Sequence, residues 1–91
     1  MARVVALIRV LPTEVEVKPE QLLERIASKL PQKYQIIKHA KEPIAFGLEA
    51  LKIAVAMPEK IEGGTQELED IIARVDGVGQ VDVLMVTRMP E

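Results

Sequence analysis

The sequence predicts a small α+β domain in which strands and helices follow one another in the order β-α-β-β-α-β. Two segments carry apolar residues at helical spacing, and four are rich in the β-branched and apolar residues that favour strands. The chain has 91 residues, of which 48% are hydrophobic and 29% charged, and it contains no linker or low-complexity tract. We therefore expect one domain, residues 1–91, with a single hydrophobic core.

The first half of the chain predicts two strands separated by a helix. Residues 3–12 (RVVALIRVLP) are apolar on both alternating sides, which is typical of a central strand covered on both faces, or covered on one and adhesive on the other. The helix is expected to begin at Pro19 and to be stopped by Pro31. Its apolar stripe is Leu22, Leu23, Ile26, Ala27 and Leu30. Residues 33–46 predict a more polar edge strand. The lysines that would protect this edge are Lys33, Lys38 and Lys41.

The second half predicts a strand, a helix and a last strand. Residues 48–58 have large apolar side chains on one side and small or charged ones on the other, so we place the large side under the helices. The large set is Leu51, Ile53, Val55 and Met57, and the opposite set is Lys52, Ala54 and Ala56. Residues 65–77 predict a helix with Gly77 as its C-cap. Its apolar stripe is Leu68, Ile71, Ile72 and Val75. Residues 80–90 alternate loosely as a strand.

This order of elements favours the ferredoxin-like arrangement, because each helix must connect two parallel strands while a short turn joins the middle pair. The result is a four-stranded antiparallel sheet with both helices on one face. The other face is left to water or to a partner. Small side chains there let another backbone approach closely, so we expect a docking platform rather than a catalytic cleft.

Composition excludes several classes of function. The net charge of −2 and the presence of only two aromatic residues, Tyr34 and Phe46, argue against nucleic acid as a direct partner. The sequence has no cysteine, which removes disulfides and thiolate chemistry and favours the cytoplasm, because small secreted domains usually need such cross-links. The longest apolar stretch, residues 4–11, is too short to span a membrane, so we expect no membrane partner.

The sequence is poor in catalytic groups. His39 is the only histidine and has no ligand pattern around it, and the only serine, Ser28, has no neighbouring base. Carboxylates gather near the start of the second helix, where the helix dipole favours them without a metal. They are Glu59, Glu62, Glu67, Glu69 and Asp70. The Gly63-Gly64-Thr65 turn lacks the other residues of a phosphate-binding loop. We therefore expect neither an enzyme with covalent chemistry nor a metal or other cofactor.

Two features point instead to binding. The turn Pro43-Ile44-Ala45-Phe46-Gly47-Leu48 sets the only Phe beside a Gly, where the ring is either a plug for the core or a projecting aromatic anchor. The chain ends with Arg88 and Met89 before Pro90 and Glu91, which is either a fraying terminus or a second contact site.

Several motifs resemble one family along nearly the whole chain. They are VVA in the first strand, EPIAFGLEALKI (Glu42 to Ile53), EGGT (Glu62 to Thr65) and VDGVGQVDV (Val75 to Val83), of which PIAFGLxAL is the most specific. The chain is similar to the guanine nucleotide exchange domains of elongation factor 1-beta, in their archaeal form. The resemblance implies the ferredoxin-like fold and a partner, elongation factor 1-alpha, whose GDP is released so that GTP can bind.

The resemblance also implies roles for particular residues. Phe46 would lodge in the partner, with Pro43, Ile44 and Gly47 shaping its turn. Residues at the C-terminal end would disturb the partner's magnesium site. The eukaryotic domain has a lysine near this end, whereas here Arg88 is the nearest cation, followed by Met89. Further interface candidates are Lys52, His39 and Lys41, for which the alternative is a solvated surface charge.

Other functions of this fold remain to be compared. The main alternative is a small-molecule regulatory module that dimerises through its sheet, whereas the exchange factor would be monomeric alone. An RNA-recognition module would need aromatic residues on the central strands, and a metal chaperone would need a Cys-x-x-Cys loop. An acylphosphatase would need an asparagine, and the sequence contains none.

Overall fold

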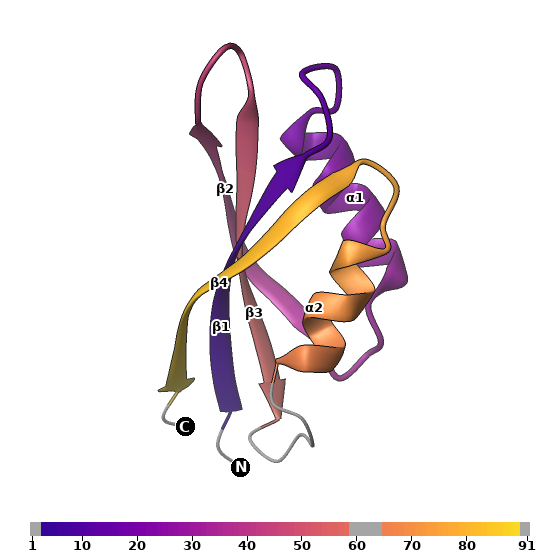
Figure 1. Cartoon of the computed structure of the whole chain (residues 1–91). Coiled ribbons are helices and arrows are strands. Elements are labelled where there is room, and N and C mark those ends of the chain that lie inside the picture. Colours follow the sequence, from indigo (N-terminus) through magenta and orange to yellow (C-terminus); the bar gives the residue numbers. More distant parts are fainter. Residues whose placement is uncertain (1–2, 59–64, 90–91) are drawn as a thin grey trace.

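The computed structural model describes residues 3–58 and 65–89 and has the predicted order of elements. These are β1 (Arg3–Pro12), α1 (Pro19–Lys29), β2 (Gln35–Pro43), β3 (Glu49–Pro58), α2 (Gln66–Ala73) and β4 (Val78–Met89). All neighbouring strands are antiparallel, in the order β2-β3-β1-β4, and both helices cover the same face of the sheet (Figure 1). The predicted ferredoxin-like α+β fold is confirmed. Among the predicted features, the Gly63-Gly64 part of the turn, Glu59 and Glu62 lie outside the described residues.

The hydrophobic core lies between the sheet and the two helices. The large side chains of β3 face the helices as predicted, and alternate residues of β1 lie beside them on the same face. The strand contribution is Ala6, Ile8, Val10, Leu51, Ile53, Val55 and Met57, and the helical contribution is Leu22, Ile26, Leu68 and Ile72. β1 is a central strand, and the helices cover only one of its faces. Of the two alternatives for this segment, coverage on both faces is therefore wrong.

Helix α1 has the predicted ends but a narrower apolar stripe. Pro19 is the first helical residue, and the Leu30 N–H donates to the carbonyl of Ile26 at 3.1 Å just before Pro31. The prediction that Ala27 belongs to the buried stripe is wrong, because Ala27 is exposed. The three buried residues of the helix, Pro19, Leu22 and Ile26, together with half-buried neighbours, are enough to cover the sheet.

The prediction that Gly77 caps the second helix is wrong. α2 ends at Ala73, with Arg74 as its cap. Gly77 has φ +95° in the following turn, in which the Val78 N–H donates to the Val75 carbonyl at 3.1 Å. The positive φ favours glycine there, and a Cβ would also crowd the side chains of Arg25 and Val17, at 2.8 Å from Arg25 Nη1 and 3.0 Å from Val17 Cγ1.

The strand β2 forms one edge of the sheet, as predicted, but Lys33 does not belong to it. Lys33 Nζ lies 2.6 Å from Glu67 Oε1 on α2, and the Tyr34 hydroxyl donates to the same oxygen at 2.7 Å. Burial, followed by the hydrogen bond to Glu67, raises the pKa of Tyr34 to about 12. The hydrogen bonds from Lys33 and Tyr34 lower the pKa of Glu67. These contacts of Lys33 and Tyr34 with Glu67 connect the segment before β2 to α2.

Candidate partner-binding site

The turn between β2 and β3 holds two consecutive residues in the left-handed region of backbone conformation. Phe46 has φ +53° and Gly47 has φ +82°. The turn is closed by the Leu48 N–H, which donates to the Ala45 carbonyl at 2.9 Å, and by the Ile44 N–H, which donates to the Leu48 carbonyl at 2.9 Å. Positive φ at both central positions is what a type I′ hairpin turn requires.

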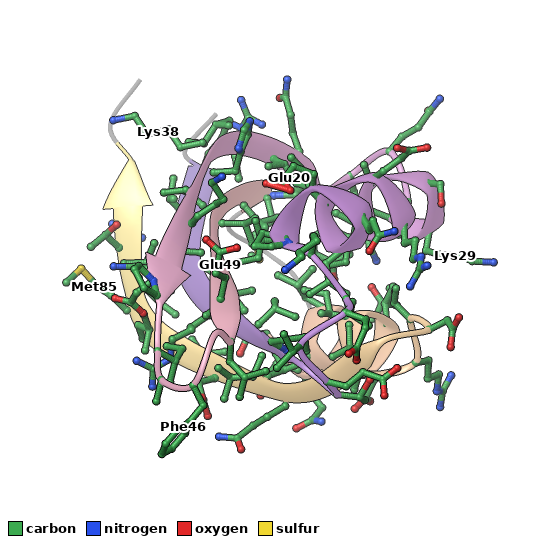
Figure 2. The ribbon with its side chains drawn as sticks, turned by 90° about the horizontal axis from the view of Figure 1, so that it is seen from above. Glu20, Lys29, Lys38, Phe46, Glu49 and Met85 are labelled. Carbon is green, nitrogen blue, oxygen red and sulfur yellow. The ribbon has the colours of Figure 1, made fainter. Side chains whose placement is uncertain are left out.

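The Phe46 side chain is 96% exposed, and Figure 2 shows it pointing away from the rest of the molecule. The core-plug alternative is therefore wrong. A left-handed conformation costs a residue other than glycine about 1–2 kcal/mol, and Asn or Asp would tolerate this position better. A fully exposed ring kept in a costly conformation contributes nothing to the core, and such residues concentrate at binding sites.

Two other exposed apolar side chains lie in this turn or beside it. Ile44 is 45% exposed in the same turn, and Val15, in the segment after β1, is 39% exposed. A Cβ built on Gly47 would lie 3.7 Å from Val15 Cγ1, so the two segments touch. We call Val15, Ile44 and Phe46 the apolar tip. Val15 had no signal in the sequence, because it comes beside the turn only through the fold.

The sheet face turned away from the helices carries a row of charges from all four strands. Arg9 of β1 lies 3.8 Å from Glu42 of β2 and 3.6 Å from Asp82 of β4, and Lys52 of β3 lies 3.9 Å from Glu42. Lys52 is thus an ion-paired member of this row. Arg9 Nε and Glu42 Oε1 are buried and have no hydrogen-bond partner among the described residues.

Next to this charged row lies an apolar strip. Leu7 of β1 is paired with Ala54 of β3 on one side and with Met85 of β4 on the other. Met85 is 56% exposed and points away from the helices (Figure 2). We call the surface formed by the charged row and by this strip the open face.

A side-chain hydrogen bond lies on the side of the apolar strip opposite the charged row. The Arg3 guanidinium donates to Gln35 Oε1 at 3.0 Å, across β3. Ala56 is paired with Gln35 and is completely buried. The predicted platform of small residues is therefore narrower than expected, because Ala54 remains partly exposed and Ala56 does not.

The C-terminal candidates lie at the opposite end of the molecule from the apolar tip. Arg88 and Met89 are the last residues of β4 and pair with Val4 and Arg3 of β1, so the fraying-terminus alternative is wrong as far as Met89. The predicted Pro90 and Glu91 lie outside the described residues. In Figure 1 the β2–β3 turn and the C-terminal end of β4 lie at opposite ends of the sheet. The structure brings Pro43, Ile44, Phe46 and Gly47 together, places Lys52 between the two ends, and keeps Arg88 and Met89 apart from the turn.

The remaining candidates, His39 and Lys41, lie on the helix side of β2. They pair with Ile53 and Leu51, and Lys41 Nζ lies 3.4 Å from Glu20 Oε1. Both line a shallow cleft of about 230 Å³ between α1 and β2. This volume is below the roughly 300–1,000 Å³ of typical small-molecule sites.

Within residues 3–58 and 65–89, no three His, Asp or Glu side chains come together as a metal-binding group. In the same part of the chain, no helix is long and apolar enough to cross a membrane.

Comparison with solved structures supports the fold alone. The chain is similar to the C-terminal domain of the MgtC protein from Mycobacterium tuberculosis, with a TM-score of 0.56 and 11% sequence identity over 88% of this chain and 83% of the other.

Comparison at the sequence level supports the family. Elongation factor 1-beta of Thermofilum pendens is 59% identical over 88 residues, which is 97% of each chain. Elongation factor 1-beta of Aeropyrum pernix is 48% identical over 98% of this chain and 99% of its own length. Residues 5–89 match the family described as the EF-1 guanine nucleotide exchange domain. The chain belongs to this family of guanine nucleotide exchange domains.

Proposed function

We propose that this chain promotes the exchange of GDP for GTP on elongation factor 1-alpha by binding the nucleotide-free state of that protein more tightly than the GDP-bound state. Its family makes it a guanine nucleotide exchange factor of translation elongation, and the family implies an interaction with elongation factor 1-alpha. Binding is reciprocal. If the factor binds nucleotide-free elongation factor 1-alpha (its client) more tightly than the GDP-bound form, it weakens the client's affinity for GDP by the ratio of those two affinities.

This mechanism needs no covalent step. The factor has only to supply contacts that exist in the empty conformation of the client and are lost or weakened in the GDP-bound one. The factor itself binds no cofactor, acts as a monomer and works in the cytoplasm.

The observation that carries the proposal is Phe46. Phe46 is 96% exposed and has a left-handed backbone conformation, and two other exposed apolar side chains lie in its turn or beside it. Exposed aromatic anchors of this kind dominate the binding energy of small protein interfaces. We assign Phe46 to a pocket on the client, with Pro43, Ile44 and Gly47 fixing the position of the turn.

The opposite end supplies the second contact. Arg88 is exposed near the end of β4, and β4 holds it to β1 up to Met89. In a nucleotide-bound G protein, Mg²⁺ and a lysine neutralise the phosphates. A guanidinium brought close to that site competes with the cation for the same negative groups, so we assign Arg88, together with Met89, to the magnesium end of the client.

The test is a nucleotide-release experiment. Elongation factor 1-alpha from the same source is loaded with a fluorescent GDP analogue, and its release is followed after addition of excess unlabelled GDP with and without this chain. The unsubstituted chain is expected to accelerate GDP release. The Phe46→Ala variant is expected to accelerate it less, whereas the control Phe46→Tyr, which keeps an aromatic ring, should retain most of the activity. No acceleration by the unsubstituted chain at a few micromolar rejects the proposal.

A further inference from the structure

We infer that Val15 is a positioning residue for Phe46, and that the segment between β1 and α1 supports the turn that carries the ring. The inference rests on the proposed function, in which Phe46 enters a pocket on elongation factor 1-alpha. It gives a role to residues 13–18, in which the sequence showed no functional pattern, and to the two glycines of the VDGVGQV motif.

The turn that carries Phe46 extends beyond the part of the sheet in which β3 has a strand on both sides. β1 pairs with β3 up to Val10 and Leu51, whereas β2 and β3 continue together to Pro43 and Glu49. Beyond Leu51 the hairpin is therefore two-stranded. A two-stranded hairpin by itself is marginally stable in water, so a contact from another segment restricts the motion of its turn.

Such a contact comes from Val15. The Val17 N–H donates to the Glu14 carbonyl at 3.2 Å and closes a turn with Val15 and Glu16 at its centre. A Cβ built on Gly47 would lie at an ordinary van der Waals distance, 3.7 Å, from Val15 Cγ1. Figure 1 shows the segment after β1 and the β2–β3 turn at the same end of the molecule.

Valine is an unusual residue at the centre of an exposed turn. Such positions favour Gly, Pro, Asn, Asp and Ser. Val15 is 39% exposed, so burial in the core does not account for it. A β-branched side chain is stiff at its first torsion angle, which suits a residue that must hold a neighbouring turn in one place.

The segment that carries Val15 is itself held on both sides of this residue. Before it, the Thr13 N–H donates to the Gly77 carbonyl at 2.9 Å. After it, Val17 packs against the hydrophobic core. Val15 therefore reaches the hairpin from a segment that is fixed to the body of the domain.

The two glycines of the VDGVGQV motif make this attachment possible. A Cβ at Gly77 would lie 3.0 Å from Val17 Cγ1, and a Cβ at Gly79 would lie 3.0 Å from the carbonyl oxygen of Pro12. Glycine at both positions lets the start of β4 approach residues 12–17 closely. The motif thus fixes the segment from which Val15 supports the Phe46 turn.

A supported turn binds at lower cost. A mobile turn would have to become ordered when Phe46 enters its pocket, and that loss of entropy would subtract from the affinity. Val15 lies beside Gly47 and leaves the Phe46 side chain 96% exposed, so the support does not occupy the surface of the ring.

The first test needs no client. Hydrogen exchange followed by NMR reports on opening of the turn through the Ile44 and Leu48 amides, which donate the hydrogen bonds that close it. Val15→Ala removes both methyl groups and is expected to speed the exchange of these amides by about threefold. Val15→Ile, which keeps both Cγ atoms, should stay within about twofold, and the amides in the centre of β1 and β3 should not change in either variant.

The second test is the nucleotide-release experiment. We expect Val15→Ala to lower the acceleration of GDP release by about threefold, and Val15→Ile to retain most of it. Glu16→Ala changes the neighbouring position of the same turn and is the control. It should stay within about twofold of the unsubstituted chain.

A double variant distinguishes positioning from direct contact. If Val15 acts through Phe46, adding Val15→Ala to a chain that already carries Phe46→Ala has no further effect on GDP release, because the effects of coupled residues do not add. An equal effect of Val15→Ala with and without the ring, together with unchanged turn amides, would mean that Val15 touches the client itself. That result would overturn the inference.

The remaining outcomes separate the inference from the proposed function. If Phe46→Ala slows release while Val15→Ala is as active as the unsubstituted chain, the proposed function stands and the inference fails. The inference also fails if Glu16→Ala has the same effect as Val15→Ala. If the unsubstituted chain does not accelerate GDP release, the proposed function itself fails, and the amide exchange still shows whether Val15 supports the turn.

Discussion

At the scale of single residues, the backbone conformation of Phe46 lowers the free energy of unfolding. Its ring is 96% exposed and contributes almost nothing to the core, while its φ of +53° is unfavourable for a bulky side chain. The turn places two consecutive residues in the left-handed region, and the proposed role of the ring as an anchor would account for a phenylalanine at the first of them.

Replacing Phe46 by Asn is therefore expected to separate stability from function. Asn adopts the left-handed conformation more readily, so we expect Phe46→Asn to raise the free energy of unfolding by about 1 kcal/mol, while the acceleration of GDP release falls. Urea denaturation and the nucleotide-release assay measure the two quantities. A clear loss of stability in this variant would mean that the ring packs against the fold after all.

Tyr34 offers a second residue-scale prediction. Burial and the hydrogen bond to Glu67 raise its pKa to about 12, and as the only tyrosine in the sequence it gives an unambiguous ultraviolet signal. The unfolded chain releases this proton near the ordinary pKa of about 10, so the contribution to stability is complete below pH 10 and is lost as the pH rises through about 12.

Absorbance titration of the folded protein should thus show a midpoint well above that of the urea-unfolded protein. Glu67→Gln is expected to bring the midpoint part of the way down, because the carboxylate is removed while the burial remains. Equal midpoints in the folded and unfolded protein would show that Tyr34 is not held as described.

At the scale of elements, the β2–β3 hairpin depends on Gly47. Its φ of +82° disfavours any side chain, although a Cβ there would meet Val15 Cγ1 at an ordinary 3.7 Å. We expect Gly47→Ala to cost about 1 kcal/mol of unfolding free energy through backbone conformation alone. It should also slow GDP release less than Phe46→Ala does, since the ring remains.

Denaturant unfolding checks this value, with Ala45→Ser as the control in the same turn. Ala45 does not have positive φ, so its substitution should change stability by no more than about 0.5 kcal/mol. A Gly47→Ala variant as stable as the control would show that the turn adopts another conformation.

Elements were also the level at which prediction from the sequence worked best. The alternation of β3 and the spacing in α1 follow directly from which face is buried, so the order of elements and the core were predictable. The end of the second helix and the start of β2 were harder to predict. Gly77 and Lys33 lie a few residues outside the observed elements, because local hydrogen bonds determine where a helix or strand ends. The contact of Val15 with the turn at Gly47 and the charged row around Arg9 each join segments far apart in sequence, so they leave no local pattern.

At the scale of the whole molecule, the two proposed contacts lie at opposite ends of a body 42 Å long. Substitutions this far apart usually act independently. We expect Arg88→Ala to slow the exchange less than Phe46→Ala, and the double variant to show the product of the two factors. Release rates of the two single variants and the double variant measure this. An equal or larger effect of Arg88→Ala would mean that the C-terminal end matters more than this account allows. A double variant no slower than Phe46→Ala would mean that the two ends do not make separate contacts with elongation factor 1-alpha.

The central claim is that the chain prefers the empty client, and calorimetric titration tests it most directly. The chain is titrated into nucleotide-free elongation factor 1-alpha and, separately, into the same protein saturated with GDP and Mg²⁺. The account predicts a markedly lower Kd for the empty form, by the same factor by which the chain weakens GDP binding. Equal affinity for the two forms would contradict it, because such a partner cannot shift the nucleotide equilibrium.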